Sequence, residues 1–310
     1  MTSKLTLAYS TCPNDTFIFH ALKERLINCG DLEFNIKLAD VEELNQKAEK
    51  NIYDISKLSF ATIGHLQDNY GLLKTGAALG RGCGPLIVAR KDCINKDLLS
   101  CKIAIPGIRT TANMLLGLYL SENSNLQNRI KHPTLSNDIS HIEHHAVHQT
   151  TPSIIPQTIP MTFDKIMPAL QNNECQFGAI IHEGRFTYKN YDLVCIADLG
   201  NWWEKKTSLP IPLGGIAIKR DLPVDIIRKV ESIIGESVKY GFKHKTASAD
   251  YIKQYASEMD DSVINEHINL YVNDFSVNLG TEGKKAVEKL FSEAKKHHLI
   301  PSKNNMSIFA

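Results

Sequence analysis

Three features that indicate particular partners or compartments are missing from this sequence: an excess of one charge, a long hydrophobic run and paired cysteine motifs. Its 310 residues carry 35 basic and 34 acidic side chains. The formal net charge of +1 gives no global attraction to nucleic acid or to an anionic membrane. No stretch approaches the roughly 18 apolar residues of a membrane-spanning helix, and the N-terminus lacks the apolar segment of a signal peptide. We therefore expect a cytoplasmic protein with no nucleic-acid partner and no membrane span.

Cysteine is present, but not in a pattern that indicates pairing. The seven cysteines are scattered, odd in number and never spaced as C-x-x-C. The sequence therefore predicts neither a disulfide framework nor a structural zinc site. Tryptophan occurs only as the adjacent pair Trp202 and Trp203. These rings could cover an aromatic ligand or pack beside a connection between domains, and the sequence leaves both interpretations open.

What the sequence does contain is an alternation of strand and helix patterns. Short β-like runs such as 4–9 and 102–107 alternate with amphipathic helical segments such as 15–27 and 109–120. This alternation predicts an α/β protein with largely parallel sheets. Because 310 residues exceed what one ordinary core supports, two domains are expected.

Two connections that contain glycine and proline predict how the chain passes between the domains. One spans 71–91 and the other spans 209–220. If both cross between domains, residues 1–88 and 213–310 form domain one and residues 89–212 form domain two. The expected architecture is a two-lobed, type II periplasmic-binding-protein-like fold. It has two mainly parallel sheets flanked by helices, with a ligand cleft between the lobes.

Glycines alternate in the segment GRGCG, residues 80–84. The segment leads into a strand, whereas a phosphate-binding loop leads from a strand into a helix. We therefore expect a hinge or a close approach of two backbones here.

Residues 121–158 form a polar segment without a clear period, which we interpret as an insertion in domain two. Several of its histidines have helical spacing that could suit a metal. No carboxylate or cysteine pattern supports such a site, so a solvated, peripheral insertion is the preferred interpretation. The segment holds His132, His141, His144, His145 and His148, and only the last four have this helical spacing.

Candidate site residues follow the predicted strands, because the carboxyl ends of parallel strands and the helix N-termini share one edge of a sheet. The apolar run 175–181 ends abruptly at His182 and Glu183. A histidine at this edge faces the cleft and can move protons near neutral pH, or it can be a hydrogen-bonded structural group. The residues alone make a general base possible, and they leave open whether Glu183 orients it.

Two further strand-to-helix junctions carry polar residues. Thr110 and Thr111 follow the strand 102–106, where their hydroxyls and the free N–H groups of a helix would suit an anion. Thr110 could equally be only the cap of its helix. Lys57 could pair with a carboxylate or phosphate to which Ser59 donates, although a surface lysine and a capping serine explain this pattern more simply.

The segment YSTCPNDTFIF, residues 9–19, forms a fourth junction. Asn14 or Asp15 is placed to cap the helix that follows, and either could reach a ligand. Cys12 lies near the helix N-terminus, where a thiol can have a lowered pKa. A structural role for Cys12 is favoured, because the local sequence fixes no histidine beside it.

Seven blocks in the same order resemble the 1,4-dihydroxy-6-naphthoate synthase family, the lyases of the futalosine route to menaquinone. The blocks are STCPNDTFIFHAL, SKLSFA, ALGRGCGPLIVAR, PGIRTTANMLL, GAIIHEGRFTY, DLGNWWE and YVNDFSVNLGTEGKKAVEKLF. The similarity covers nearly the whole chain except about residues 121–158. Several blocks in the right order are far more specific than any single motif.

The resemblance implies a cytoplasmic enzyme with the two-lobed fold and with no metal or organic cofactor. It implies that cyclic dehypoxanthine futalosine is split to give 1,4-dihydroxy-6-naphthoate. The family's proposed base lies in its IIHE block, which contains His182 here. Proton abstraction by His182 would lead to carbon–carbon cleavage and aromatisation. The substrate-contact blocks of the family fall on Lys57, Leu58, Ser59, Thr110 and Thr111.

Two other functions compete with this one. Chorismate dehydratase, the sister enzyme of the same pathway, shares the fold, but its N-terminal block does not resemble CPNDTFIF. A non-catalytic small-molecule binding protein would need no base at His182, and a secreted solute-binding protein should carry a signal. The sequence does not indicate an oligomeric state.

Overall fold

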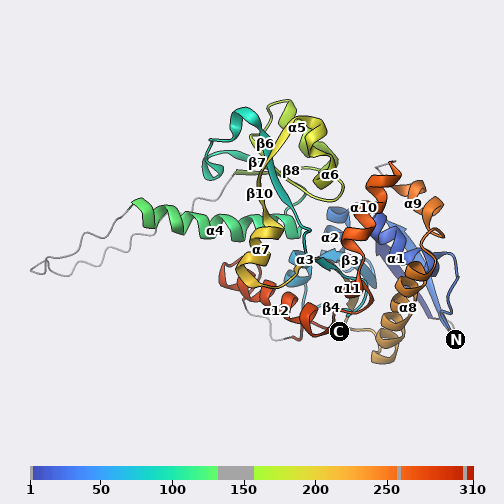
Figure 1. Ribbon diagram of the computed structural model, residues 1–310. Coiled ribbons are helices and arrows are strands. Elements are labelled where there is room, and N and C mark those ends of the chain that lie inside the picture. The colour runs from blue at the N-terminus through green and yellow to red at the C-terminus, as the bar shows by residue number, and fades with distance from the viewer. Residues whose placement is uncertain (1–2, 132–156, 257–259, 303–305) are drawn as a thin grey trace, which may run out of the picture.

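Two separate sheets organise the chain, which this computed structural model describes over residues 3–131, 157–256, 260–302 and 306–310 (Figure 1). The first sheet has the order β2–β1–β3–β11–β4, with β5 also paired to β11. Its strands are β1 (Ser3–Tyr9), β2 (Leu32–Leu38), β3 (Ile55–Ser59), β4 (Tyr70–Leu72), β5 (Ala78–Gly80) and β11 (Ile211–Lys219). The second sheet has the order β10–β6–β9–β7–β8. Its strands are β6 (Leu86–Arg90), β7 (Lys102–Ile105), β8 (Gln157–Pro160), β9 (Phe177–Ile180) and β10 (Leu193–Asp198).

Helices flank both sheets, which confirms the α/β class. Those before the last strand are α1 (Pro13–Lys23), α2 (Val41–Glu49), α3 (Phe60–His65), α4 (Thr111–Lys131), α5 (Phe163–Gln171), α6 (Gly184–Thr187) and α7 (Leu199–Thr207). The chain then ends in α8 (Val224–Lys243), α9 (Ala249–Tyr255), α10 (Asp261–Tyr271), α11 (Asp274–Val277) and α12 (Gly280–Lys296). Short 3₁₀ turns cover Lys91–Cys93, Leu98–Ser100 and Tyr188–Tyr191. No helix in the described part of the chain is long and apolar enough to cross a membrane.

Both sheets are mixed, whereas the sequence predicted mainly parallel ones. β1 is parallel to β2 and β3, and β7 is parallel to β8 and β9. In contrast, β11 runs antiparallel to β3, β4 and β5, and β6 runs antiparallel to β9 and β10. β6 and β11 are the strands by which the chain enters each sheet from the other lobe. Each of them is therefore antiparallel to its neighbours, whereas strands joined by a local strand–helix–strand unit are parallel to each other.

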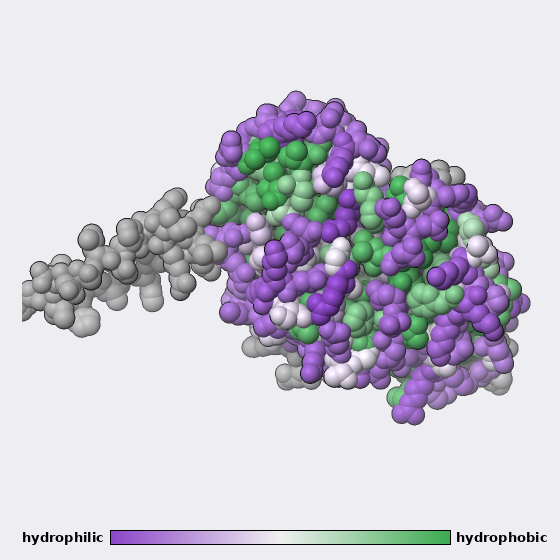
Figure 2. All heavy atoms as spheres, in the orientation of Figure 1, coloured by the Kyte–Doolittle hydropathy of each residue, from purple (hydrophilic) through white to green (hydrophobic). Residues whose placement is uncertain are grey.

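The order of strands along the chain follows the predicted threading. β1 to β5 belong to the first sheet, β6 to β10 to the second, and β11 returns to the first. The exact domain boundaries stay a prediction. In Figure 2 hydrophilic residues dominate the visible face, and apolar residues show in patches on the upper lobe and beside the junction of the lobes.

The first connection between the lobes packs closely against the start of α7 in the second lobe. A Cβ on Gly84, whose φ is +118°, would lie 3.0 Å from the Cα of Gly200. A Cβ on Gly200 would lie 1.7 Å from the carbonyl oxygen of Cys83, so only glycine fits there. Arg185 ties this crossing to the second lobe by donating to the Gly84 carbonyl at 3.0 Å and to Asp198 at 2.6 Å. The close backbone approach predicted for GRGCG is confirmed.

The predicted insertion begins as regular helix. α4 continues through Lys131 and extends away from the body of the molecule (Figure 1), and Glu122 on it pairs with Lys206 of α7. The sequence of this part gave no clear period, because a helix leaving the body needs no apolar stripe. The insertion ends within β8, at the edge of the second sheet. Residues 132–156, with the predicted histidine cluster, lie outside the described residues.

We expect Gly178→Ala to destabilise the second lobe. A Cβ at Gly178 in β9 would lie 2.6 Å from Ile166 Cγ2 and 3.1 Å from Leu170 Cδ1, both on α5. Overpacking of this kind should lower the free energy of unfolding by about 1–3 kcal/mol in urea denaturation. Gly235→Ala in α8 is the control. Its Cβ would meet only Thr75 Oγ1 at 3.6 Å, so it should be neutral or stabilising by roughly 0.5–1 kcal/mol. Equal stability of the two variants would contradict this account.

Candidate active site

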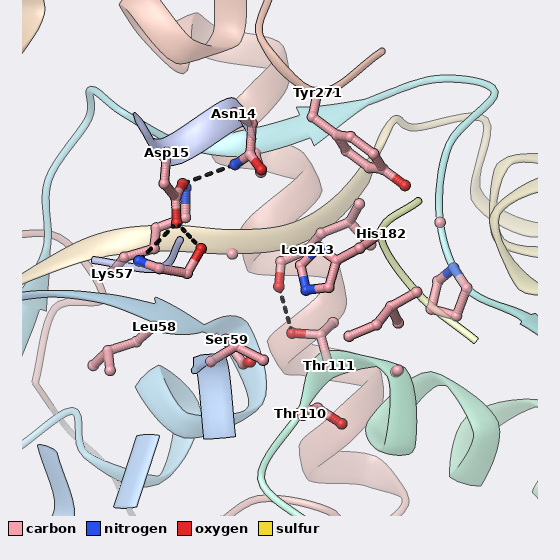
Figure 3. Close-up of a pocket in the computed structure, with 18 residues that line it drawn as sticks. Asn14, Asp15, Lys57, Leu58, Ser59, Thr110, Thr111, His182, Leu213 and Tyr271 are labelled. Carbon is pink, nitrogen blue, oxygen red and sulfur yellow. Dashed lines mark hydrogen bonds and ion pairs between the residues drawn. The ribbon is translucent and has the colours of Figure 1, made fainter. Parts of the chain in front are cut away.

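A pocket of about 680 Å³, counted to its open mouth, lies between the two lobes (Figure 3). Strand ends and helix starts of both sheets supply its lining, as expected for a ligand site in an α/β protein. The structure brings all eight predicted site residues into this lining, and their roles stay predictions. They are Asn14, Asp15, Lys57, Leu58, Ser59, Thr110, Thr111 and His182.

His182 lies two residues beyond β9, in a left-handed backbone conformation with φ +54°. The turn brings its ring edge-on to Phe163, with centroids 5.1 Å apart, and nearly parallel to the ring of His267 at 6.0 Å. Its Nδ1 lies 3.5 Å from Cys12 Sγ. Among the described residues, no carboxylate hydrogen-bonds the ring. Glu183 precedes α6, where its carbonyl accepts from the Phe186 N–H.

Cys12 is a buried thiol that faces His182. It is the N-cap residue of α1, so the prediction that Asn14 or Asp15 caps this helix is wrong. Burial raises the pKa of the Cys12 thiol well above its ordinary value, and the nearby carboxylates of Glu183 and Asp15 add to this. The thiol is therefore protonated near neutral pH, which argues against a nucleophilic Cys12.

Lys57 and Asp15 form a buried ion pair at the base of the pocket. Their nitrogen and oxygen lie 2.9 Å apart, and the side chains are only 6% and 2% exposed. Lys57 also donates to the Gly76 carbonyl at 3.1 Å, while Asp15 accepts from Ser10 Oγ at 2.7 Å and Asn14 Nδ2 at 2.8 Å. The surface lysine favoured from the sequence is thus wrong, because Asp15 supplies the countercharge that makes burial possible.

His267 on α10 is a site residue that the sequence did not indicate. It is 1% exposed, and its Nε2 lies 2.9 Å from Asn14 Oδ1. Because Asn14 donates its amide to Asp15, its oxygen must accept, and His267 therefore carries its hydrogen on Nε2. Nδ1 is buried without a partner among the described residues. Burial, followed by the neighbouring His182, lowers the pKa of His267 well below its ordinary value, so it is neutral.

Both threonines line the pocket, and Thr111 also connects the two lobes. Thr110 Oγ1 donates to the Gly107 carbonyl at 2.8 Å and accepts from the Asn113 N–H at 3.3 Å, so it caps α4. Thr111 Oγ1 donates to the Leu213 carbonyl of β11 at 2.6 Å. The N–H groups that start α4 therefore sit at the pocket, where they suit a negatively charged group.

The tryptophan pair is structural. Trp203 is fully buried in the core, and its Nε1 donates to the Pro210 carbonyl at 3.2 Å beside the return connection. Trp202 packs edge-on against Tyr119 of α4. Neither residue lines the pocket, so the interpretation of a roof over an aromatic ligand is not supported.

Two α/β lobes connected by two crossings, with a pocket between them, define a periplasmic-binding-protein-like fold. Solved structures agree with this class. The alkanesulfonate-binding protein of Xanthomonas axonopodis pv. citri superimposes with a TM-score of 0.65 over 97% of this chain and 96% of that chain, at 12% identity. A protein from Archaeoglobus fulgidus superimposes with a TM-score of 0.80 over 96% and 98% of the two chains, at 29% identity.

Among proteins with this fold, the relatives in sequence identify a particular family. A family model described as menaquinone biosynthesis matches residues 5–148 and 147–296. The 1,4-dihydroxy-6-naphthoate synthase of Thermus thermophilus is 38% identical over 290 residues, covering 94% of this chain and 93% of that protein. The enzyme of the same name from Streptomyces coelicolor is 35% identical over 298 residues, covering 96% and 95%. The chain belongs to this menaquinone-biosynthesis family, which confirms the resemblance found in its sequence blocks.

We expect Lys57→Met to destabilise the protein strongly, because it leaves the buried Asp15 carboxylate without its countercharge. Removing one member of a buried pair costs about 3–5 kcal/mol of unfolding free energy. Lys229→Met is the control, because the Lys229–Asp31 pair is 46% and 52% exposed and should contribute at most about 1 kcal/mol. Urea denaturation measures both. If Lys57→Met lowered the free energy of unfolding no more than the control does, a stabilising role for the pair would be contradicted.

His267 should make stability depend on pH. In the unfolded chain a histidine takes up a proton below about pH 6.5, whereas folded His267 stays neutral because burial lowers its pKa. The unfolded state then binds more protons, so stability falls as pH falls, by up to about 1.4 kcal/mol per pH unit for one site. His267→Gln keeps a donor for Asn14 and should give a shallower slope of unfolding free energy between about pH 6.5 and 5.

The control for this experiment is His298→Asn, at an exposed histidine. It should keep the slope of the wild type. An unchanged slope in His267→Gln would show that His267 is protonated in the folded protein as readily as in the unfolded chain.

Proposed function

We propose that this protein is a cytoplasmic carbon–carbon lyase, a 1,4-dihydroxy-6-naphthoate synthase that acts on cyclic dehypoxanthine futalosine. Two relatives of that name support the activity, at 38% and 35% identity over nearly the whole chain. The observation that carries the proposal is the position of His182. Its ring lies on the wall of the interlobe pocket, together with the polar residues expected to contact the substrate.

His182 would act as the general base. Its ring neighbours are uncharged: Phe163 is apolar, His267 is held neutral and Cys12 keeps its proton. A neutral imidazole in this setting has a free lone pair for a substrate proton. The electron pair left behind drives cleavage of the carbon–carbon bond, and the aromatic product provides the driving force. The protein contributes positioning and a pocket with little water.

The remaining polar residues would hold the substrate. The N–H groups at the start of α4, beside Thr110 and Thr111, suit a carboxylate. Ser59 receives a hydrogen bond from Asn45 at 3.1 Å, which orients its hydroxyl beside the same pocket. Lys57 is already neutralised by Asp15, so it contributes a hydrogen-bond donor rather than a free charge.

His182→Asn tests the base without straining the backbone. Asparagine tolerates a positive φ better than alanine does, and it cannot accept the proton. The matched control is His298→Asn, because His298 also has a positive φ, of 57°, but lies on the surface. With cyclic dehypoxanthine futalosine, we expect the wild type and His298→Asn to form the dihydroxynaphthoate, followed by mass spectrometry. His182→Asn should lose about 10²-fold or more in kcat.

Other outcomes separate the alternatives. Equal rates in His182→Asn and the wild type would keep the family assignment and remove His182 as the base. Dehydration of chorismate in a parallel incubation would identify the sister activity. Tight binding without turnover of either compound would indicate a binding protein.

A further inference from the structure

Tyr271 presents an unpartnered hydroxyl to the pocket. It ends α10, lines the pocket and is only 6% exposed. Figure 3 shows its ring projecting from α10 toward the side of the pocket where His182 lies. Among the described residues, no side chain or backbone group hydrogen-bonds its hydroxyl. A buried phenol normally has such a partner, so a ligand or water must supply it here.

Other buried tyrosines of the same chain show the contrast. The Tyr70 hydroxyl donates to the Tyr53 carbonyl at 2.6 Å, and the hydroxyls of Tyr9 and Tyr251 lie 2.6 Å apart. The protein itself supplies the hydrogen-bond partners of these hydroxyls, and none of the three tyrosines lines the pocket. Tyr271 is therefore exceptional among them in both its location and its free hydroxyl.

The ring of Tyr271 is held in place before any ligand arrives. Its centroid lies 4.7 Å from that of His267, which Asn14 fixes through a 2.9 Å hydrogen bond. Burial raises the pKa of Tyr271, so its hydroxyl keeps its hydrogen and acts as a donor near neutral pH. A donor that is fixed in advance stabilises developing negative charge without reorganisation during the reaction.

We infer that Tyr271 is a catalytic hydrogen-bond donor to the substrate oxygen that gains negative charge when His182 removes the proton. The inference rests on the proposed function and extends it to a residue on α10. The proton moves from the substrate to His182, and the electron pair is held as negative charge on that oxygen before it drives the carbon–carbon cleavage. The Tyr271 O–H bond stays intact, so the phenol donates a hydrogen bond and transfers no proton.

Tyr271→Phe removes this one oxygen atom and keeps the ring. We expect a loss of about 10²-fold or more in kcat, as when a fixed donor is removed from an oxyanion site, and little change in the Kd of the substrate. The thermal midpoint should not fall, because none of the described residues hydrogen-bonds the hydroxyl that is removed. Tyr70→Phe is the matched control. It should keep kcat within about threefold and lower the midpoint, because it leaves the buried Tyr53 carbonyl unpaired.

Each result decides a separate point. A Tyr271→Phe variant within tenfold of the wild-type kcat overturns the donor role and leaves the proposed function standing. A variant that melts well below the wild type, or that does not fold, also overturns it, because the hydroxyl would then have a structural partner. An inactive wild type overturns the proposed function itself, and the role of Tyr271 with it. A loss of tenfold or more in kcat with an unchanged midpoint supports the inference.

Discussion

The buried ion pair between Asp15 and Lys57 fixes the groups on which the pocket depends. Two desolvated charges are tolerated because Ser10, Asn14 and Gly76 supply further hydrogen bonds. The negative charge of Asp15 sets the orientation of the Asn14 amide, and that amide sets the hydrogen position on His267. An ion pair whose two charges cancel therefore organises the uncharged rings around the candidate base.

The connection between the lobes also constrains the backbone at this site. Gly84 and Gly200 allow the first connection to touch α7, and Arg185 ties that connection to the second lobe. Arg185 follows His182 by a single short turn, while β9 precedes it as an inner strand of the second sheet. The left-handed backbone of His182 is thus held from both sides, which is how an unfavourable conformation persists at this candidate position.

The sequence was sufficient for the α/β class, the threading and the eight pocket residues, because strand ends and family blocks are local signals. It was not sufficient for the strand directions of β6 and β11, which depend on how one lobe feeds the other. His267 and Tyr271 show only a four-residue helical spacing in HINLY, and nothing local says which face of α10 meets the pocket. The burial of Lys57 was equally hidden, since only its partner on a different element makes it possible.

The uncharged rings around His182 have a consequence for the proposed mechanism. In hydrolases with a serine–histidine–aspartate triad, a carboxylate orients the histidine and stabilises its protonated form. Here the backbone turn and the rings of Phe163 and His267 orient His182, and no carboxylate hydrogen-bonds its ring among the described residues. The imidazolium that the proposed proton abstraction would form therefore has no carboxylate hydrogen-bonded to it in the described part of the chain. His182 is only half-buried at the pocket, so in the proposed mechanism water would take the proton from it once the product leaves.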